Sequence, residues 1–160
     1  MLNILANYHR WAYQALYQIV DQLPDASYRK DLGLFFKSIH GTLNHLLLVD
    51  RLWLSRFVGN TIKVDHLDQE LVRDREQLKS ELDQQAIRWI DFIEALDLRA
   101  LPENLDYTNT KGIQSTVPYE KALYHVFNHG THHRGQISTA LTKLGCEAPV
   151  MDLIYFKDEV

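Results

Sequence analysis

The chain has 160 residues, of which 46% are hydrophobic and 24% are charged, and its formal net charge is −4. This composition fits a single globular domain over residues 1–160, and the acidic balance with scattered Lys and Arg disfavours a nucleic-acid partner. One cysteine, an N-terminus without the apolar stretch of a signal peptide, and apolar runs shorter than the roughly 20 residues of a membrane span lead us to expect a soluble, cytoplasmic protein.

Three stretches in the first part of the chain have apolar residues spaced three, four or seven positions apart, as amphipathic helices do. The first covers about residues 2–22 and stops before Pro24. The second covers about residues 32–58, with Phe35 at the start of its apolar face. The third covers about residues 68–97, with charged side chains opposite its apolar face. We expect these three helices to pack in a bundle.

Residues 98–117 show a different pattern, in which every second residue is picked out on both sides of Lys111-Gly112: Leu105, Tyr107 and Asn109 before it, and Ile113, Ser115 and Val117 after it. Alternation around a glycine turn predicts a short β-hairpin. Pro118 then suits the first turn of a fourth helix, which Gly145 ends. The tail from Pro149 to Phe156 is too apolar for a free end, and we expect it to pack on the helices or on another subunit.

The expected fourth helix holds four of the eight histidines within nine residues, 125–133. Its apolar stripe passes through His129 and His133, so both imidazoles face the interior. Two imidazoles one helical turn apart can share one metal ion. Without partners, each would cost about 1–3 kcal/mol to bury, so we prefer a metal site to two hydrogen-bonded core histidines. Gly130 and Gly135 beside them predict close approach of a helix or ligand.

A third ligand must come from another helix, because His125 and His133 lie about 12 Å apart along the helix axis. His45 faces apolar neighbours in the expected second helix and is the best candidate. Gln136 is a candidate to orient a ligand, with a solvated glutamine as the alternative. Four histidines are interpreted as surface residues or as supports of the ligands: His9, His40, His66 and His132.

Five segments carry a resemblance to a known family, and the last is the most specific: residues 8–12 (YHRWA), 38–45 (SIHGTLNH), 50–54 (DRLWL), 107–112 (YTNTKG) and 125–136 (HVFNHGTHHRGQ). They resemble the DinB family, which includes YfiT-like proteins regarded as metal-dependent hydrolases and is related to bacterial thiol transferases. The resemblance covers nearly the whole chain.

The resemblance implies both a fold and a site. In that family one histidine of the second helix and two of the last helix bind a divalent metal, and the matching residues are His45, His129 and His133. The implied fold is all-α, a four-helix bundle with up-down-down-up connections and a short β-hairpin in the crossover before the last helix, commonly in a homodimer. The tryptophans are spaced as core residues. Trp11, in the first segment, joins Gln136 and His132 as a candidate for the surrounding pocket.

Two classes of function fit this site. Three histidine ligands leave at least one coordination position of the metal open. The preferred metals are zinc and nickel, with iron and copper as alternatives. The first function is an enzyme acting on a small molecule. Transfer of a low-molecular-weight thiol is preferred narrowly over hydrolysis, because no acidic side chain lies at ligand-adjacent spacing to serve as a base. The alternative is a non-catalytic metal-binding stress-response protein in which the ion staples two helices. A cavity that reaches the ion would favour the enzyme.

Overall fold

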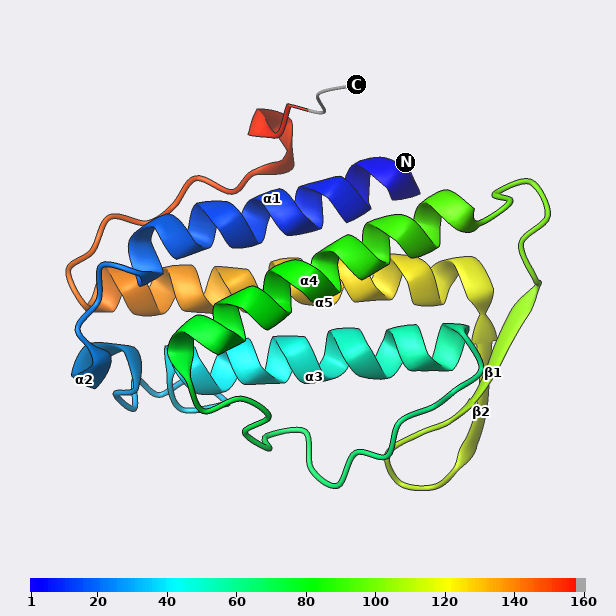
Figure 1. Cartoon of the computed structure of the whole chain (residues 1–160), viewed down its shortest axis with the longest axis horizontal. Helices are drawn as coiled ribbons and strands as arrows, with labels where there is room; N and C mark the ends of the chain where they lie inside the picture. Colours follow the sequence, from blue (N-terminus) through cyan, green and yellow to red (C-terminus); the bar gives the residue numbers. More distant parts are fainter. Residues whose placement is uncertain (158–160) are drawn as a thin grey trace.

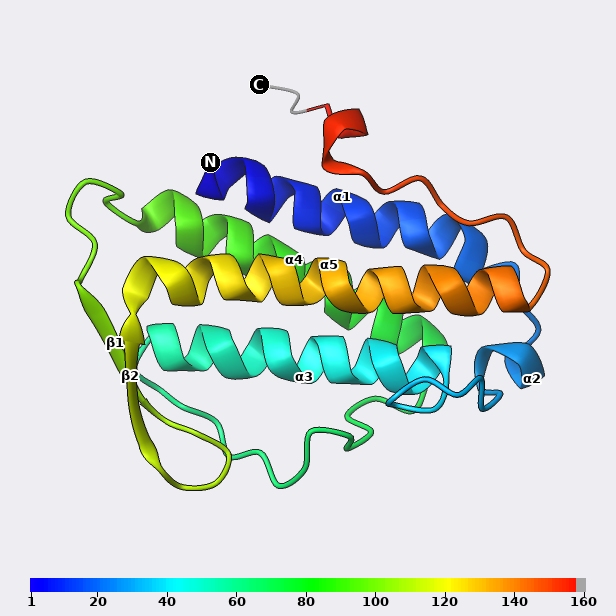
Figure 2. The same cartoon turned by 180° about the vertical axis from the view of Figure 1, so that it is seen from behind.

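The computed structural model describes residues 1–157, and four long helices make up most of them: α1 (Leu2–Val20), α3 (Ile39–Phe57), α4 (Arg75–Ala95) and α5 (Tyr119–Lys143). Both α1 and α3 pack against α4 and α5. In Figure 1, and from behind in Figure 2, α1 and α5 run in one direction and α3 and α4 in the other. The remaining elements are the short helix α2 (Asp25–Tyr28), the strands β1 (Asn104–Thr108) and β2 (Gln114–Pro118), and the 3-10 turn η1 (Leu153–Tyr155). Among the described residues, none of the helices combines the length and the apolar character that a membrane span requires.

The expectation of a mainly helical chain with a short hairpin before the last helix is confirmed. β1 and β2 pair antiparallel, from Asn104 opposite Pro118 to Thr108 opposite Gln114. Gly112 in the connecting turn has a φ of 77°, a backbone conformation that favours glycine. The hairpin leads directly into α5, and its strands pass the end of α3, with the turn beside the loop that follows α3 (Figure 1).

Two helices begin later than the sequence pattern predicts. The predicted second helix starts at Ile39 rather than near residue 32, because Ser38 caps it by accepting a hydrogen bond from the Gly41 amide. The predicted third helix likewise starts at Arg75, after the cap Asp74. The assignment of Phe35 to an apolar helix face is wrong, since this side chain is 83% exposed in the loop before α3.

The core divides into two apolar clusters along the helices, with a buried polar layer between them. In this layer His9 of α1 lies 3.0 Å from an oxygen of Asp50 of α3, and Arg134 of α5 donates to its other ring nitrogen at 3.1 Å. His9 and Asp50 are completely buried. The interpretation of His9 as a surface residue or a support of the ligands is therefore wrong, because it is buried and pairs with Asp50 and Arg134. Its partners lie on other helices, where spacing along α1 could not show them.

Gly130 permits this contact between α1 and α5. A β-carbon at Gly130 would lie 2.6 Å from His9 Cε1 and 2.8 Å from an Arg134 nitrogen, closer than packed atoms come. The predicted close approach is confirmed at Gly130. At Gly135, a β-carbon would meet nothing within 4 Å, so the same prediction is wrong there.

The tail after α5 packs back along α1, as one of the two alternatives predicted (Figure 1). Tyr8 donates a hydrogen bond to the Met151 carbonyl at 2.6 Å, and the Phe156 ring lies against Tyr8 and Trp11. Ile154 stays 84% exposed. The tail therefore covers part of α1 and leaves an apolar side chain at the surface.

Candidate metal centre

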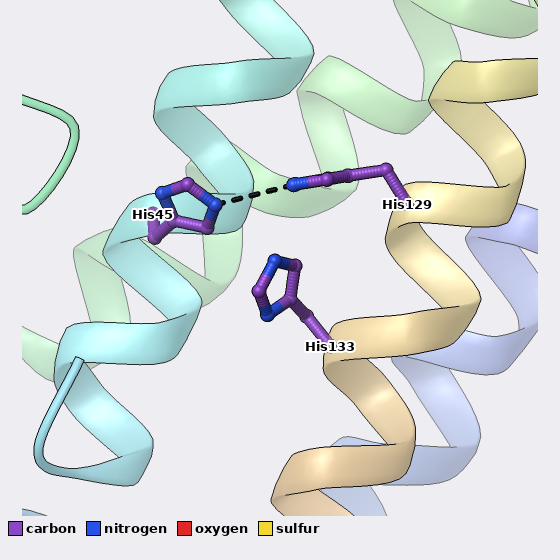
Figure 3. A group of neighbouring side chains, drawn as sticks. All are labelled: His45, His129 and His133. Atoms are coloured by element: carbon purple, nitrogen blue, oxygen red, sulfur yellow. Dashed lines mark hydrogen bonds between the residues drawn. The ribbon is translucent and has the colours of Figure 1, made fainter. Parts of the chain in front are cut away.

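The structure brings together the three histidines that the sequence singled out. His45 projects from α3 toward His129 and His133 of α5 (Figure 3), and one ring nitrogen from each lies within 4.8 Å of the others. The Nε2 atoms of His45 and His129 are 3.2 Å apart. Two nitrogens that bind one ion at a right or tetrahedral angle are about 2.9–3.4 Å apart. The spacing of these two nitrogens therefore suits shared ligation of one ion.

Hydrogen bonds to the outer ring nitrogens orient two of these imidazoles. His45 Nδ1 lies 2.8 Å from the carbonyl oxygen of Leu67, and His133 Nδ1 lies 2.8 Å from Gln136 Oε1. Because both partners accept, each Nδ1 carries the proton and each Nε2 keeps its lone pair. Such outer hydrogen bonds commonly orient metal-binding histidines. The structure thus places Gln136 where an orienting residue would lie.

Burial keeps the three imidazoles neutral. Desolvation, with repulsion from the neighbouring imidazoles, lowers the pKa of His129 to about 3, and desolvation lowers the pKa of His45 to about 4. Burial also lowers the pKa of His133. In residues 1–157 no hydrogen-bond partner reaches the buried His129 Nδ1. Neutral imidazoles with converging lone pairs are the state that a divalent ion requires, so the residues fit a metal.

Phe36 covers one side of this cluster, and sequence reasoning missed it. Its ring stacks on His45 with centroids 3.7 Å apart and meets the edge of His133. The loop before α3 passes so close to Gly41 that a β-carbon there would lie 2.2 Å from the Phe36 carbonyl oxygen. The helical periodicity selected Phe35 instead. The capping signal of Ser38 could have shown that both phenylalanines precede the helix.

The other two residues proposed for the pocket, His132 and Trp11, lie outside the histidine cluster. His132 is exposed and lies 3.0 Å from the Gln136 side chain. Trp11 packs against Tyr8 and Phe156, and it lines a separate cavity with Arg10 and Gln14.

The remaining histidines His66 and His40 differ in their exposure to solvent. His66 is exposed, as interpreted from the sequence. His40 is buried, so its interpretation as a surface residue is wrong: it lies 3.0 Å from the Tyr28 hydroxyl and 2.6 Å from a Glu70 oxygen. Both partners come from segments outside α3, which periodicity within α3 could not reveal.

A cavity of about 240 Å³ opens beside His45 and His129, between α3, α5 and the hairpin. Five of its lining residues come from one side of α3: His45, Val49, Leu52, Trp53 and Arg56. Sequence reasoning missed Arg56, although its helical spacing from His45 was a usable signal. His125, one turn before His129, also lines the cavity. Burial, with the nearby charge of Arg56, lowers the pKa of His125.

Comparisons with known proteins cover nearly the whole chain. The family model described as the DinB family matches residues 1–159, a range that contains all three histidines of the cluster. Protein DinB of Bacillus subtilis (strain 168) is 28% identical over 153 residues, which cover 88% of this chain and 84% of that protein.

Proposed function

This chain belongs to the DinB family, and we propose that it is a metal-dependent enzyme acting on a small molecule, with His45, His129 and His133 as the metal ligands. The observation that carries the proposal is the cavity that reaches two of these histidines. Within residues 1–157, no further His, Cys, Asp or Glu joins the cluster to close it. The helix directions in Figure 1 support the family's up-down-down-up four-helix bundle as the scaffold.

The three imidazoles would hold one divalent ion, with zinc or nickel preferred and iron or copper as alternatives. Held by three side chains, such an ion keeps a coordination position open and supplies Lewis acidity that lowers the pKa of a thiol or of water.

We prefer thiol transfer to hydrolysis that uses a carboxylate base. No Asp or Glu lines the cavity in the described part of the chain, so a carboxylate base is missing there. His125 is the base we propose, because its lowered pKa leaves it neutral near pH 7. In the proposed reaction His125 accepts the thiol proton, the sulfur forms a bond to an electrophilic carbon, and the leaving group departs with the electrons of the broken bond.

A non-catalytic, metal-binding stress-response role is the second candidate. It is favoured by the fact that the cluster joins α3 to α5, so a bound ion would staple two helices. This role needs no open cavity beside the ligands, and we therefore rank it below the enzyme.

Two measurements test the proposal. Elemental analysis of the untagged protein should find one divalent metal per chain in the wild type and in His66→Ala, a control at an exposed histidine, and none in His45→Ala. The metal-loaded protein should then accelerate the reaction of a small thiol with a chlorodinitrobenzene, and His125→Gln should slow it without loss of metal. Full metal content in His45→Ala would refute the ligand set. Metal binding without turnover of any thiol or ester tested would favour the stapling role.

A further inference from the structure

Arg56 is a buried cation in the wall of the cavity beside the histidine cluster. It is only 7% exposed. Its guanidinium packs against two neighbouring aromatic rings, 4.5 Å from the Trp53 centroid and 4.4 Å from the Tyr107 centroid. The two ring centroids are only 5.3 Å apart, so both rings lie on the same side of the guanidinium. These contacts hold the planar group in place and leave its edge, where the N–H donors lie, for another partner.

No partner for that edge comes from the described chain. Arg56 Nε is buried without a hydrogen-bond acceptor. None of the ion pairs within residues 1–157 includes Arg56. A buried charge without a counter-ion is costly, and burial accordingly lowers the pKa of Arg56. A ligand that supplies the missing anion would offset the cost of this buried charge at the cavity wall.

The surroundings of Arg56 suit an anion. Arg56 lines both the cavity at the histidines and an adjoining cavity of about 330 Å³. Neither cavity is lined by Asp or Glu among the described residues, whereas the second also has Lys63 in its wall. This exclusion of acidic side chains is notable in a chain with 21 acidic and 17 basic residues. Lys63 pairs with Asp65 at 3.2 Å, so among the described residues the unpaired positive charge shared by the two adjoining cavities is that of Arg56.

We propose that the substrate is a small anionic molecule, in which a carboxylate or phosphate group pairs with the edge of Arg56 while its reactive end lies at the histidine cluster. This inference rests on the proposed function and specifies its substrate class. The guanidinium fork matches two oxygens of either anion, and the low polarity of the aromatic walls strengthens the pair. Arg56 acts here as a binding residue that positions the substrate.

Matched ligand series test this assignment in the zinc-loaded protein. The probes are straight-chain thiols of two to six carbons that end in an alcohol, a carboxylate or a phosphonate, and isothermal titration calorimetry measures each affinity. At one chain length, at least one anionic thiol should bind about 10-fold or more tightly than the alcohol, the range expected for a charge-assisted pair. The series of lengths is needed because only one spacing matches the distance between the cluster and Arg56.

Three variants separate the contribution of Arg56 from other causes. Arg56→Met should abolish the preference for the anion and leave the affinity for the neutral alcohol within about twofold, which also shows that the variant is folded. Arg56→Lys should keep part of the preference, and Arg88→Met, at an exposed arginine of α4, should keep all of it.

Each outcome separates this inference from the proposed function. Equal affinities of alcohol and anions at every length in the wild type would overturn the inference alone. A preference that survives Arg56→Met would assign the anion to the metal and would also overturn it. Failure of zinc to bind would overturn the proposed function and this inference with it.

Discussion

Replacement of Gly130 by alanine is the most direct test of how the helices are held around the site. The new methyl group would lie 2.6 Å from Cε1 of His9 and 2.8 Å from a nitrogen of Arg134. Neither side chain can move away cheaply, because His9 is fully buried and bonded to Asp50, and Arg134 is 1% exposed. The substitution therefore forces α5 away from α1, next to the helical turns that carry His129 and His133.

Two opposing effects set the magnitude. Alanine stabilises a helix interior by about 0.5–1 kcal/mol relative to glycine, whereas overpacking a filled core costs about 1–3 kcal/mol. The clash at Gly130 should win, with a net loss of about 1–2 kcal/mol, which lowers the melting temperature of a chain of this size by about 2–8 °C. Gly135→Ala is the matched control on the same helix, since a β-carbon there meets nothing within 4 Å. It should raise the melting temperature by about 1–4 °C.

Thermal unfolding followed by circular dichroism measures both variants. A double-mutant cycle then identifies the clashing partner: with His9 replaced by alanine, Gly130→Ala should lose most of its destabilising effect. A melting temperature of Gly130→Ala at or above that of the wild type would refute the packing argument. An unchanged penalty in the His9→Ala background would show that His9 is not the residue that is displaced.

Four further predictions concern stability, pH, the ligand set and assembly. Chelation should lower the melting temperature by about 5–11 °C relative to protein held at a free metal concentration of about 100 times the dissociation constant. The chelated protein should keep its helical circular dichroism, because the two apolar clusters fold without metal; a coil spectrum would contradict this. Burial lowers the pKa of His9 from 6.5, assisted by Arg134 and opposed by Asp50, so the unfolded chain binds this proton more tightly, and the stability is complete above about pH 6.5 and declines as the pH falls below it. His9→Gln should reduce that decline, measured by urea unfolding, by up to about 1.4 kcal/mol per pH unit, and an unchanged slope would refute the assignment. His40→Ala should keep full metal content but lose about 1–3 kcal/mol of unfolding free energy with its bonds to Tyr28 and Glu70; loss of metal would place His40 in the site. We also propose a homodimer, partly through the exposed apolar side chains of the tail, and sedimentation equilibrium at high micromolar concentration should give twice the chain mass of 18.7 kDa; a persistent single-chain mass would exclude it.

The sequence by itself determined the features that depend on neighbours along the chain. Helical periodicity identified the long helices, and alternation around Gly112 identified the hairpin, because backbone hydrogen bonding imposes those repeats locally. The spacing of His129 and His133 placed both on one helix face for the same reason. The late starts of α3 and α4 were also readable, since Ser38 and Asp74 are good caps, but an apolar pattern continuing upstream concealed them.

Only the tertiary structure decided which side chains meet across helices. The pairing of His9 with Asp50, the stacking of Phe36 on His45, and the position of Arg56 at a cavity wall depend on how the helices are rotated and offset against one another. A periodic pattern states that a residue faces inward, but it does not state what lies opposite. His45 could be selected because burial of a polar ring needs a partner, whereas the identity of each partner is set by packing between elements far apart in the chain.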